Sequence, residues 1–165
     1  MRNLIVMATL AGALGLGTIE ADVPKRIDVA KQIDLLKTGK TAGARAGAAA
    51  ELGRHGAIRA RDVKDALDPL REALKNDDSA DVRRAAAKAL GDISPDAAAT
   101  VPALTEALKD KSPVVKMAAA RALGQYGVEA RSAVPALQPL AKEKSDKKVM
   151  QAARLALKSI RGKKK

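Results

Sequence analysis

The sequence predicts an all-α fold, an α-solenoid of about four helix pairs, because several residue patterns recur at one period. Three prolines, Pro69, Pro102 and Pro135, stand 33 residues apart, and serines at 79, 112 and 145 keep the same spacing. The segment VRRAAAKALG at 82–91 returns as VKMAAARALG at 115–124 and, more loosely, as VMQAARLAL at 149–157. A period of this length is typical of stacked two-helix repeats.

The first 21 residues differ from the rest of the chain and are predicted to be a signal peptide. Arg2 precedes an apolar run from Leu4 to about Ile19, which is short for a membrane span, and Ala21 offers a cleavage site. We therefore expect export, to the periplasm or out of the cell, after cleavage near Ala21. A buried N-terminal helix and an uncleaved anchor are the alternatives.

The following residues are predicted to form a helical-repeat domain at 22–162 and a basic tail at 163–165. The repeats are expected at about 24–64, 65–100, 101–133 and 134–162. The first helix of a repeat carries an early proline, which needs no N–H there, and an apolar stripe such as Leu104, Ala107 and Leu108. The second helix is expected to begin at an N-cap serine, Ser79, Ser112 or Ser145, and to close at Gly91 or Gly124, where left-handed backbone favours glycine.

The first repeat is degenerate, and it contains a fragment of a phosphate-binding motif. Gly39, Lys40 and Thr41 match the last letters of a nucleotide-binding loop, but Asp34 stands where that loop needs its first glycine, and the residues before it look helical. Aligning Thr41 with Ser79 also aligns Arg45 with Arg83. The sequence thus favours a turn between paired helices, with Thr41 as the cap, over a nucleotide site.

A helix pair with this proline, this polar turn and an AAAxALG ending resembles the HEAT family, in particular the short bacterial repeats called PBS-lyase HEAT-like. The resemblance covers roughly residues 24–162 and implies a right-handed superhelix. It also implies a structural ladder of charged residues between neighbouring repeats, at Asp77, Arg83, Asp110 and Lys116. The pattern departs from the family at Gly39 in the first repeat and at Glu143 in the fourth.

The second helices supply the candidate binding surface. Val82, Ala85, Ala86, Ala89 and Leu90 form the expected inward stripe, so that Arg84 and Lys88 lie outside. At a constant spacing of 33, Lys88 aligns with Arg121 and Arg154. In the family such helices line the concave side, and a column of cations there, Arg84, Lys88, Arg121 and Arg154, suits carboxylates or phosphates of a partner. The alternative is that these side chains only keep Ala-rich helices soluble.

The composition excludes several kinds of chemistry. The chain has no Cys, hence no disulfide and no thiolate, and its single histidine, His55, cannot make a His-based metal site or triad. We expect no catalytic residue, no cofactor and no metal. His55 is predicted to lie in a solvent-facing loop, and Tyr126, the one aromatic residue, between repeats.

Three functions remain open at this point. The first is a non-catalytic adaptor in the cell envelope or outside the cell, a monomer that binds a protein partner. The second is a polyanion binder, because the net charge is +12 and residues 141–165 carry ten basic and two acidic side chains. Export argues against nucleic acid, and only an uncleaved leader would hold the chain to a membrane. The third is an accessory or maturation domain resembling those of some lyases.

Overall fold

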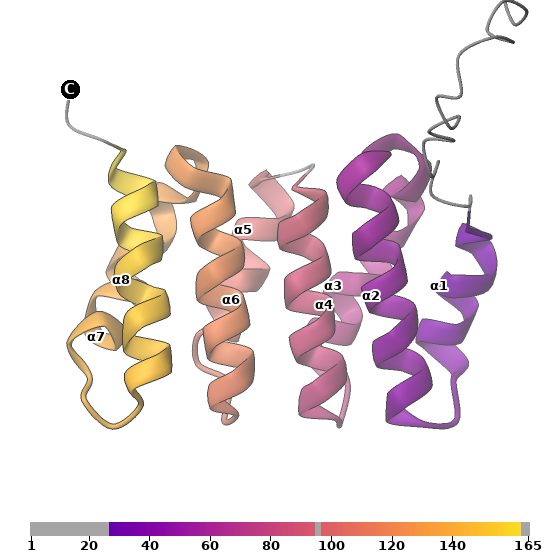
Figure 1. The fold of residues 1–165 in the computed structure, drawn as a ribbon, viewed down its shortest axis with the longest axis horizontal. Helices are drawn as coiled ribbons and strands as arrows, with labels where there is room; N and C mark the ends of the chain where they lie inside the picture. The colour runs from indigo at the N-terminus through magenta and orange to yellow at the C-terminus, as the bar shows by residue number, and fades with distance from the viewer. Residues whose placement is uncertain (1–26, 95–96, 163–165) are drawn as a thin grey trace, which may run out of the picture.

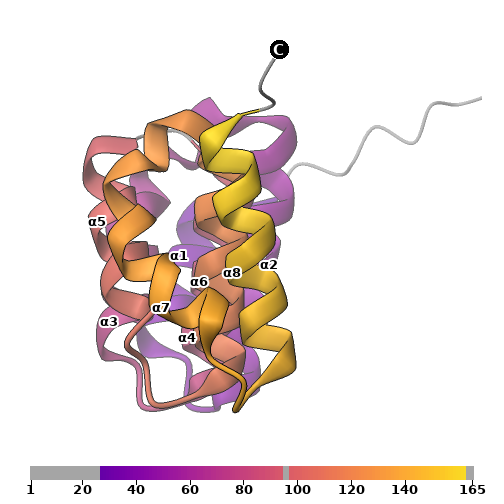
Figure 2. The ribbon, with the colours of Figure 1, turned by 90° about the vertical axis from the view of Figure 1, so that its left-hand side faces the viewer.

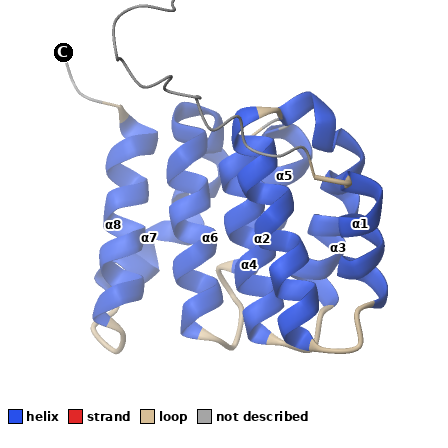
Figure 3. Cartoon of the chain, turned by 45° about the vertical axis from the view of Figure 1, so that its right-hand side comes forward, coloured by secondary structure: helices blue, strands red, loops and turns tan. Residues whose placement is uncertain are grey.

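We analysed a computed structural model, which describes residues 27–94 and 97–162. The predicted signal peptide at 1–21 and the basic tail at 163–165 lie outside the described residues. Within them the chain forms helices, turns and loops without strands (Figure 3). The expected all-α array of four helix pairs is confirmed.

Each pair consists of an A helix followed by a longer B helix. The A helices are α1 (Val29–Thr38), α3 (Leu67–Asn76), α5 (Ala97–Ala107) and α7 (Val134–Lys142). The B helices are α2 (Ala42–Ile58), α4 (Ala80–Ile93), α6 (Pro113–Tyr126) and α8 (Lys147–Arg161). Two 3₁₀ segments, η1 (Ala60–Ala66) and η2 (Gly127–Ala133), lead into α3 and α7. Because α5 begins at Ala97, the predicted repeat boundary at 100/101 lies inside this helix.

The helices form two layers. Figure 1 shows the B helices side by side in one row with A helices behind them, and Figure 2 shows the same two layers from one end. α4 packs on α2 and on α6, and α6 packs in turn on α8. Each A helix packs mainly on its own B helix. The core therefore runs along the whole array, as a repeat that cannot bury its apolar face alone requires.

Alanine supplies more of the buried core positions than any other residue, and leucine follows it. Leu52, Leu90 and Leu123 recur at the same place on successive B helices and are completely buried. Tyr126 is also buried, and its hydroxyl donates to the carbonyl oxygen of Leu90 in the preceding B helix at 3.1 Å. Its expected position between repeats is confirmed.

The helix caps shift the register of the fourth repeat by one residue. Thr41, Ser79 and Ser112 occupy N-cap positions as predicted, and the Thr41 hydroxyl accepts from the N–H of Ala44 at 3.1 Å. The N-cap of α8, however, is Asp146, whose carboxylate accepts from the N–H groups of Lys148 and Val149, so the prediction of Ser145 is wrong. The loop between α7 and α8 is one residue longer than its counterparts, and the N-cap spacing changes from 33 to 34.

Gly91 and Gly124 do not end their helices, contrary to the prediction. α4 continues to Ile93 and is followed by Ser94 with left-handed backbone (φ 43°), and α6 continues to Tyr126. Both glycines lie where the next B helix approaches. A Cβ on Gly91 would stand 2.8 Å from the Cβ and 2.9 Å from the Cα of Ala122. The glycines are thus needed for close helix packing and not for a special backbone angle.

The segment after Gly53 also differs from its prediction. α2 continues past this glycine for more than a turn, to Ile58, and His55 is therefore a buried helical residue with 7% exposure instead of a loop residue. Its ring lies 3.3 Å from the carboxylate of Asp62 in η1. The longer linker of the first repeat is thus folded onto α2 and takes part in its packing.

Two glycine substitutions test the close packing of B helices, because they are expected to change stability in opposite directions. Gly91→Ala should lower the free energy of unfolding by about 1–3 kcal/mol, since backbone atoms of Ala122 must move to admit the methyl group. Gly47→Ala in α2 should raise it by up to about 1 kcal/mol, because a Cβ there meets nothing within 4 Å and alanine favours the helix. Urea unfolding followed by circular dichroism measures both. A shift in the same direction would contradict the packing described here.

Candidate functional site: the B-helix face

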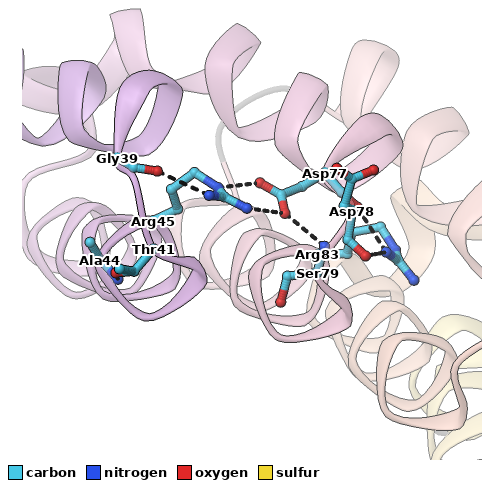
Figure 4. A network of polar contacts seen from close by, with 8 residues as sticks. All are labelled: Gly39, Thr41, Ala44, Arg45, Asp77, Asp78, Ser79 and Arg83. Carbon is cyan, nitrogen blue, oxygen red and sulfur yellow. Dashed lines mark hydrogen bonds and ion pairs between the residues drawn. The ribbon is translucent and has the colours of Figure 1, made fainter.

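Arginine–aspartate pairs join neighbouring repeats at the bottom of the B helices. Arg45 of α2 donates through Nε and Nη2 to both carboxylate oxygens of Asp77, at 2.7 and 2.9 Å, and through Nη1 to the carbonyl oxygen of Gly39 (Figure 4). Asp77 follows α3 and also accepts from the N–H of Ser79, the N-cap of α4. One carboxylate thus fixes both its own turn and the preceding repeat.

The same arrangement recurs one repeat further on. Arg83 of α4 donates to both oxygens of Asp110, at 2.7 and 3.0 Å, and to the carbonyl oxygens of Asp77 and Asp78. Its side chain is 6% exposed, and that of Asp110 is 12% exposed. A two-point guanidinium–carboxylate pair of this kind fixes direction as well as distance. The structure therefore places Arg83 with Asp110 across the repeat boundary, while Asp77 pairs with Arg45.

These contacts change the acidity of the carboxyl groups. The hydrogen bonds from Arg45 hold the pKa of Asp77 below its usual range, and they outweigh the opposing effect of burial. Burial raises the pKa of Asp110, but hydrogen bonds from Arg83 and from the Ser112 N–H, with the nearby positive charges, leave it lower than usual. Both aspartates are therefore charged in the folded protein at neutral pH.

The ladder does not continue into the fourth repeat. Lys116 occupies the position of Arg83, four residues after the N-cap of α6, and is half-buried. In the part of the chain that the structure describes, it makes no ion pair. Glu143 accepts instead from the hydroxyl of Ser145 within its own turn. Lys116 is thus the one predicted ladder residue that the structure leaves apart from a carboxylate.

The outer side of the B helices carries the residues two, five and nine positions after each N-cap. On α4 these are Asp81, Arg84 and Lys88; on α6 they are Val114, Met117 and Arg121. Because the cap of α8 lies one residue later, its ninth position is Leu155, which is 58% exposed. Arg154 is therefore turned by about 100° from the predicted column. Its Nε donates to the carbonyl oxygen of Ala141 in α7, so its alignment with Lys88 and Arg121 is corrected.

The remaining cations of this surface differ in their neighbours. Arg84 lies 3.6 Å from the carboxylate of Asp81, and Lys88 forms an ion pair with Asp92 one turn further along α4. Asp92 also accepts from the Gln125 amide of α6 at 3.3 Å. Arg121 is exposed and, among the described residues, has no carboxylate partner. We call Arg84, Lys88, Arg121, Val114, Met117 and Leu155 the B face.

Apolar side chains flank Arg121 on this face. Val114 is 40% exposed and Met117 half-buried on α6, and Leu155 lies at the corresponding height on α8. The first repeat, in contrast, presents Gly43, Ala46 and Ala50 at the equivalent positions of α2. An arginine without an acidic neighbour, next to exposed aliphatic side chains and methionine, is typical of the centre of a protein-binding surface.

The described residues offer little to an ion or to the interior of a membrane. No group of three or more His, Asp or Glu residues within them is arranged to hold a metal ion. None of their helices combines the length and apolar character that a transmembrane span needs. What the geometry of the B face provides is shape and charge for contact with another molecule.

Two layers of antiparallel helix pairs with a continuous core define an α-solenoid repeat protein. The profile of HEAT repeats matches residues 29–101 and 67–158. The chain therefore belongs to the HEAT-repeat family. No curated protein matches it closely enough to count as a relative.

Two solved structures show the same architecture. An engineered protein is 26% identical with a TM-score of 0.65, over 82% of this chain and 63% of its own. The complex of CpcE and CpcF of phycocyanin lyase from Nostoc sp. contains a chain that is 22% identical with a TM-score of 0.55, over 89% of this chain and 70% of that one. This chain thus spans less than two thirds of the engineered protein, and the second likeness concerns the fold alone.

Sequence reasoning missed two residues of this region. Arg45 was aligned with Arg83, but its partner was sought at Gly39 in its own repeat; the pairing runs to Asp77 of the next repeat. Leu155 was hidden by the constant spacing of 33, although the buried valines at 82, 115 and 149 already show the change to 34.

The ladder makes stability depend on pH. Asp110→Asn should lower the free energy of unfolding at pH 7 by about 3 kcal/mol, because the buried Arg83 loses its counter-charge. The wild-type carboxylate has a lowered pKa in the folded state, so its stabilisation is present above the unfolded value of about 3.9 and is lost as pH falls through the folded value. The difference between variant and wild type should therefore shrink below about pH 4.

Chemical denaturation at several pH values measures this difference. Asp81→Asn is the matched control, because its carboxylate is 75% exposed, and its effect should stay within about 1 kcal/mol. Equal effects of the two substitutions at pH 7 would show that the Arg83–Asp110 pair contributes nothing specific.

Proposed function

We propose that this protein is a non-catalytic HEAT-repeat scaffold that binds a protein partner through the B face. The observation that carries the proposal is Arg121, an exposed cation with no carboxylate partner among the described residues, set beside Val114, Met117 and Leu155. An arginine can meet a carboxylate of the partner with two hydrogen bonds, and the aliphatic side chains can be buried around it.

The neighbouring pairs on α4 support this assignment. Lys88 is held by Asp92, and Arg84 lies near Asp81, so their charges are partly compensated in the free protein. Arg121 has no such neighbour and gains most from an incoming acid. The preferred partner is therefore a protein surface with a carboxylate opposite α6 and apolar residues opposite α6 and α8.

The location and the mode of action belong to the same proposal. The arginine-then-apolar pattern of residues 2–21 supports export, followed by action in the cell envelope or outside the cell. The single histidine and the absence of cysteine in the sequence support binding over catalysis. The lyase complex with a similar fold is too distant in sequence, at 22% identity, to bring its activity to this chain.

A second candidate, a polyanion binder, is favoured by one observation. After Asp146 the sequence contains no acidic residue, while α8 and the residues after it carry Lys147, Lys148, Arg154, Lys158, Arg161 and three further lysines. Such a segment attracts anionic polymers without needing a shaped site. Steep loss of binding to inorganic polyphosphate with rising salt would be its signature.

Charge reversal tests the B face. Lys88→Glu combined with Arg121→Glu should abolish co-purification of the partner from the native envelope fraction, because both cations would then repel its carboxylates. Helicity and melting temperature should change little, since both side chains are exposed.

The matched control is Lys31→Glu combined with Lys64→Glu, which makes the same change of charge at exposed positions of α1 and η1. This control should retain the partner. Retention by the B-face variant, or equal loss by both variants, would remove the B face as the binding surface.

A further inference from the structure

A second surface lies at the α7–α8 end of the array, where Figure 2 looks directly onto these two helices. A groove of about 900 Å³ opens between η2, the start of α7 and α8. Four cations line it: Arg131, Arg154, Lys158 and Arg161. Val134, Leu157 and Ile160 provide its apolar part. We call this the end groove.

The charges of the end groove are uncompensated. No acidic residue lines it. Within the described residues Arg131, Lys158 and Arg161 make no ion pair, and Arg154 donates through Nε to a neutral carbonyl, that of Ala141. This differs from α4, where Arg83, Arg84 and Lys88 each lie beside a carboxylate. Four cations around one groove with no internal acid favour an anionic occupant.

The same residues distinguish this end from the interfaces inside the array. Counted from the N-caps, Arg154 replaces Ala87 and Ala120, and Lys158 replaces Gly91 and Gly124. The alanines are completely buried, and the glycines admit the next B helix at short range. Long cationic side chains at these two places prevent a further B helix from packing as closely. A partner at this end must therefore lie further out and reach the charged groups.

The groove favours a protein segment over a polymer of phosphates. Val134 is half-buried beside Arg131, and Leu157 lies between Arg154 and Lys158 in sequence, so apolar and cationic groups share one surface. A polyphosphate would use the charges and leave the apolar groups in water. An amphipathic helix with acidic residues along the edges of its apolar stripe satisfies both.

We propose that the end groove binds an acidic amphipathic helix of a partner protein, packed along α8 between Arg131 and Lys158. This surface is separate from the B face, so the two proposals can fail independently. Arg154, held toward α7 by Ala141, and Arg161 would meet carboxylates on the two edges of the helix. The apolar stripe of the helix would cover Val134 and Leu157.

Peptide binding to the full chain tests this proposal. The probe is a helix-forming peptide of about 15 residues, the length of α8, with leucines on one face and glutamates beside them. A second peptide of identical composition distributes the leucines evenly around the helix. We expect the amphipathic peptide to bind at least about tenfold more tightly in fluorescence anisotropy, because it alone buries apolar surface in the groove.

Two charge-matched variants locate the site. Arg131→Gln combined with Lys158→Gln should weaken binding about tenfold or more. Lys147→Gln combined with Lys148→Gln removes the same charge from exposed positions of α8 outside the groove and should weaken binding by no more than about threefold. Far-UV circular dichroism checks that both variants keep their helices.

Three results would overturn the proposal. Equal binding of the two peptides would show that the apolar part of the groove is not used. Equal losses in the two variants would show attraction by net charge alone. Inorganic polyphosphate that binds more tightly than the amphipathic peptide, with the same dependence on Arg131 and Lys158, would assign the groove to anionic polymers.

Discussion

The close approach of neighbouring B helices is the constraint on which the rest of the structure depends. A single helix pair of this composition, rich in alanine and nearly free of aromatic residues, cannot bury enough apolar surface to be stable alone. Gly53 and Gly91 lie against Ala89 and Ala122 of the next helix, where even a Cβ would be crowded. Small residues therefore face along the array, and larger ones remain for the two outer surfaces, the B face and the end groove.

The periodic features of the fold were predictable because each has a local physical cause. Thr41 and the serines at 79 and 112 satisfy free N-termini of helices, and the recurring alanines and leucines follow the helical period. Gly91 was misread because a glycine near the end of a helical pattern suits a C-cap and a close contact equally well, and the distinction depends on a helix 31 residues away. His55 was misplaced because its burial depends on how η1 folds back onto α2.

The candidate site was less predictable than the fold. The types of residue on the B face were found, since Lys88 and Arg121 follow the repeat. The neighbours of these cations were not, because one extra residue before Asp146 rotates α8 and replaces Arg154 by Leu155 on this surface. The partner of Arg45 was likewise hidden, as it lies in the next repeat. Register and inter-repeat pairing are tertiary properties that composition and period do not contain.

The dependence of each repeat on its neighbours has a direct test in native-state hydrogen exchange of the free protein. α4 and α6 are covered by a B helix on both sides, whereas α8 has a described B-helix neighbour on one side and no Arg–Asp pair at its boundary with α6. The slowest-exchanging amides are therefore expected in α4 and α6, with faster exchange toward α1 and α8. Slowest exchange in α8, or equal protection in all four B helices, would contradict the account.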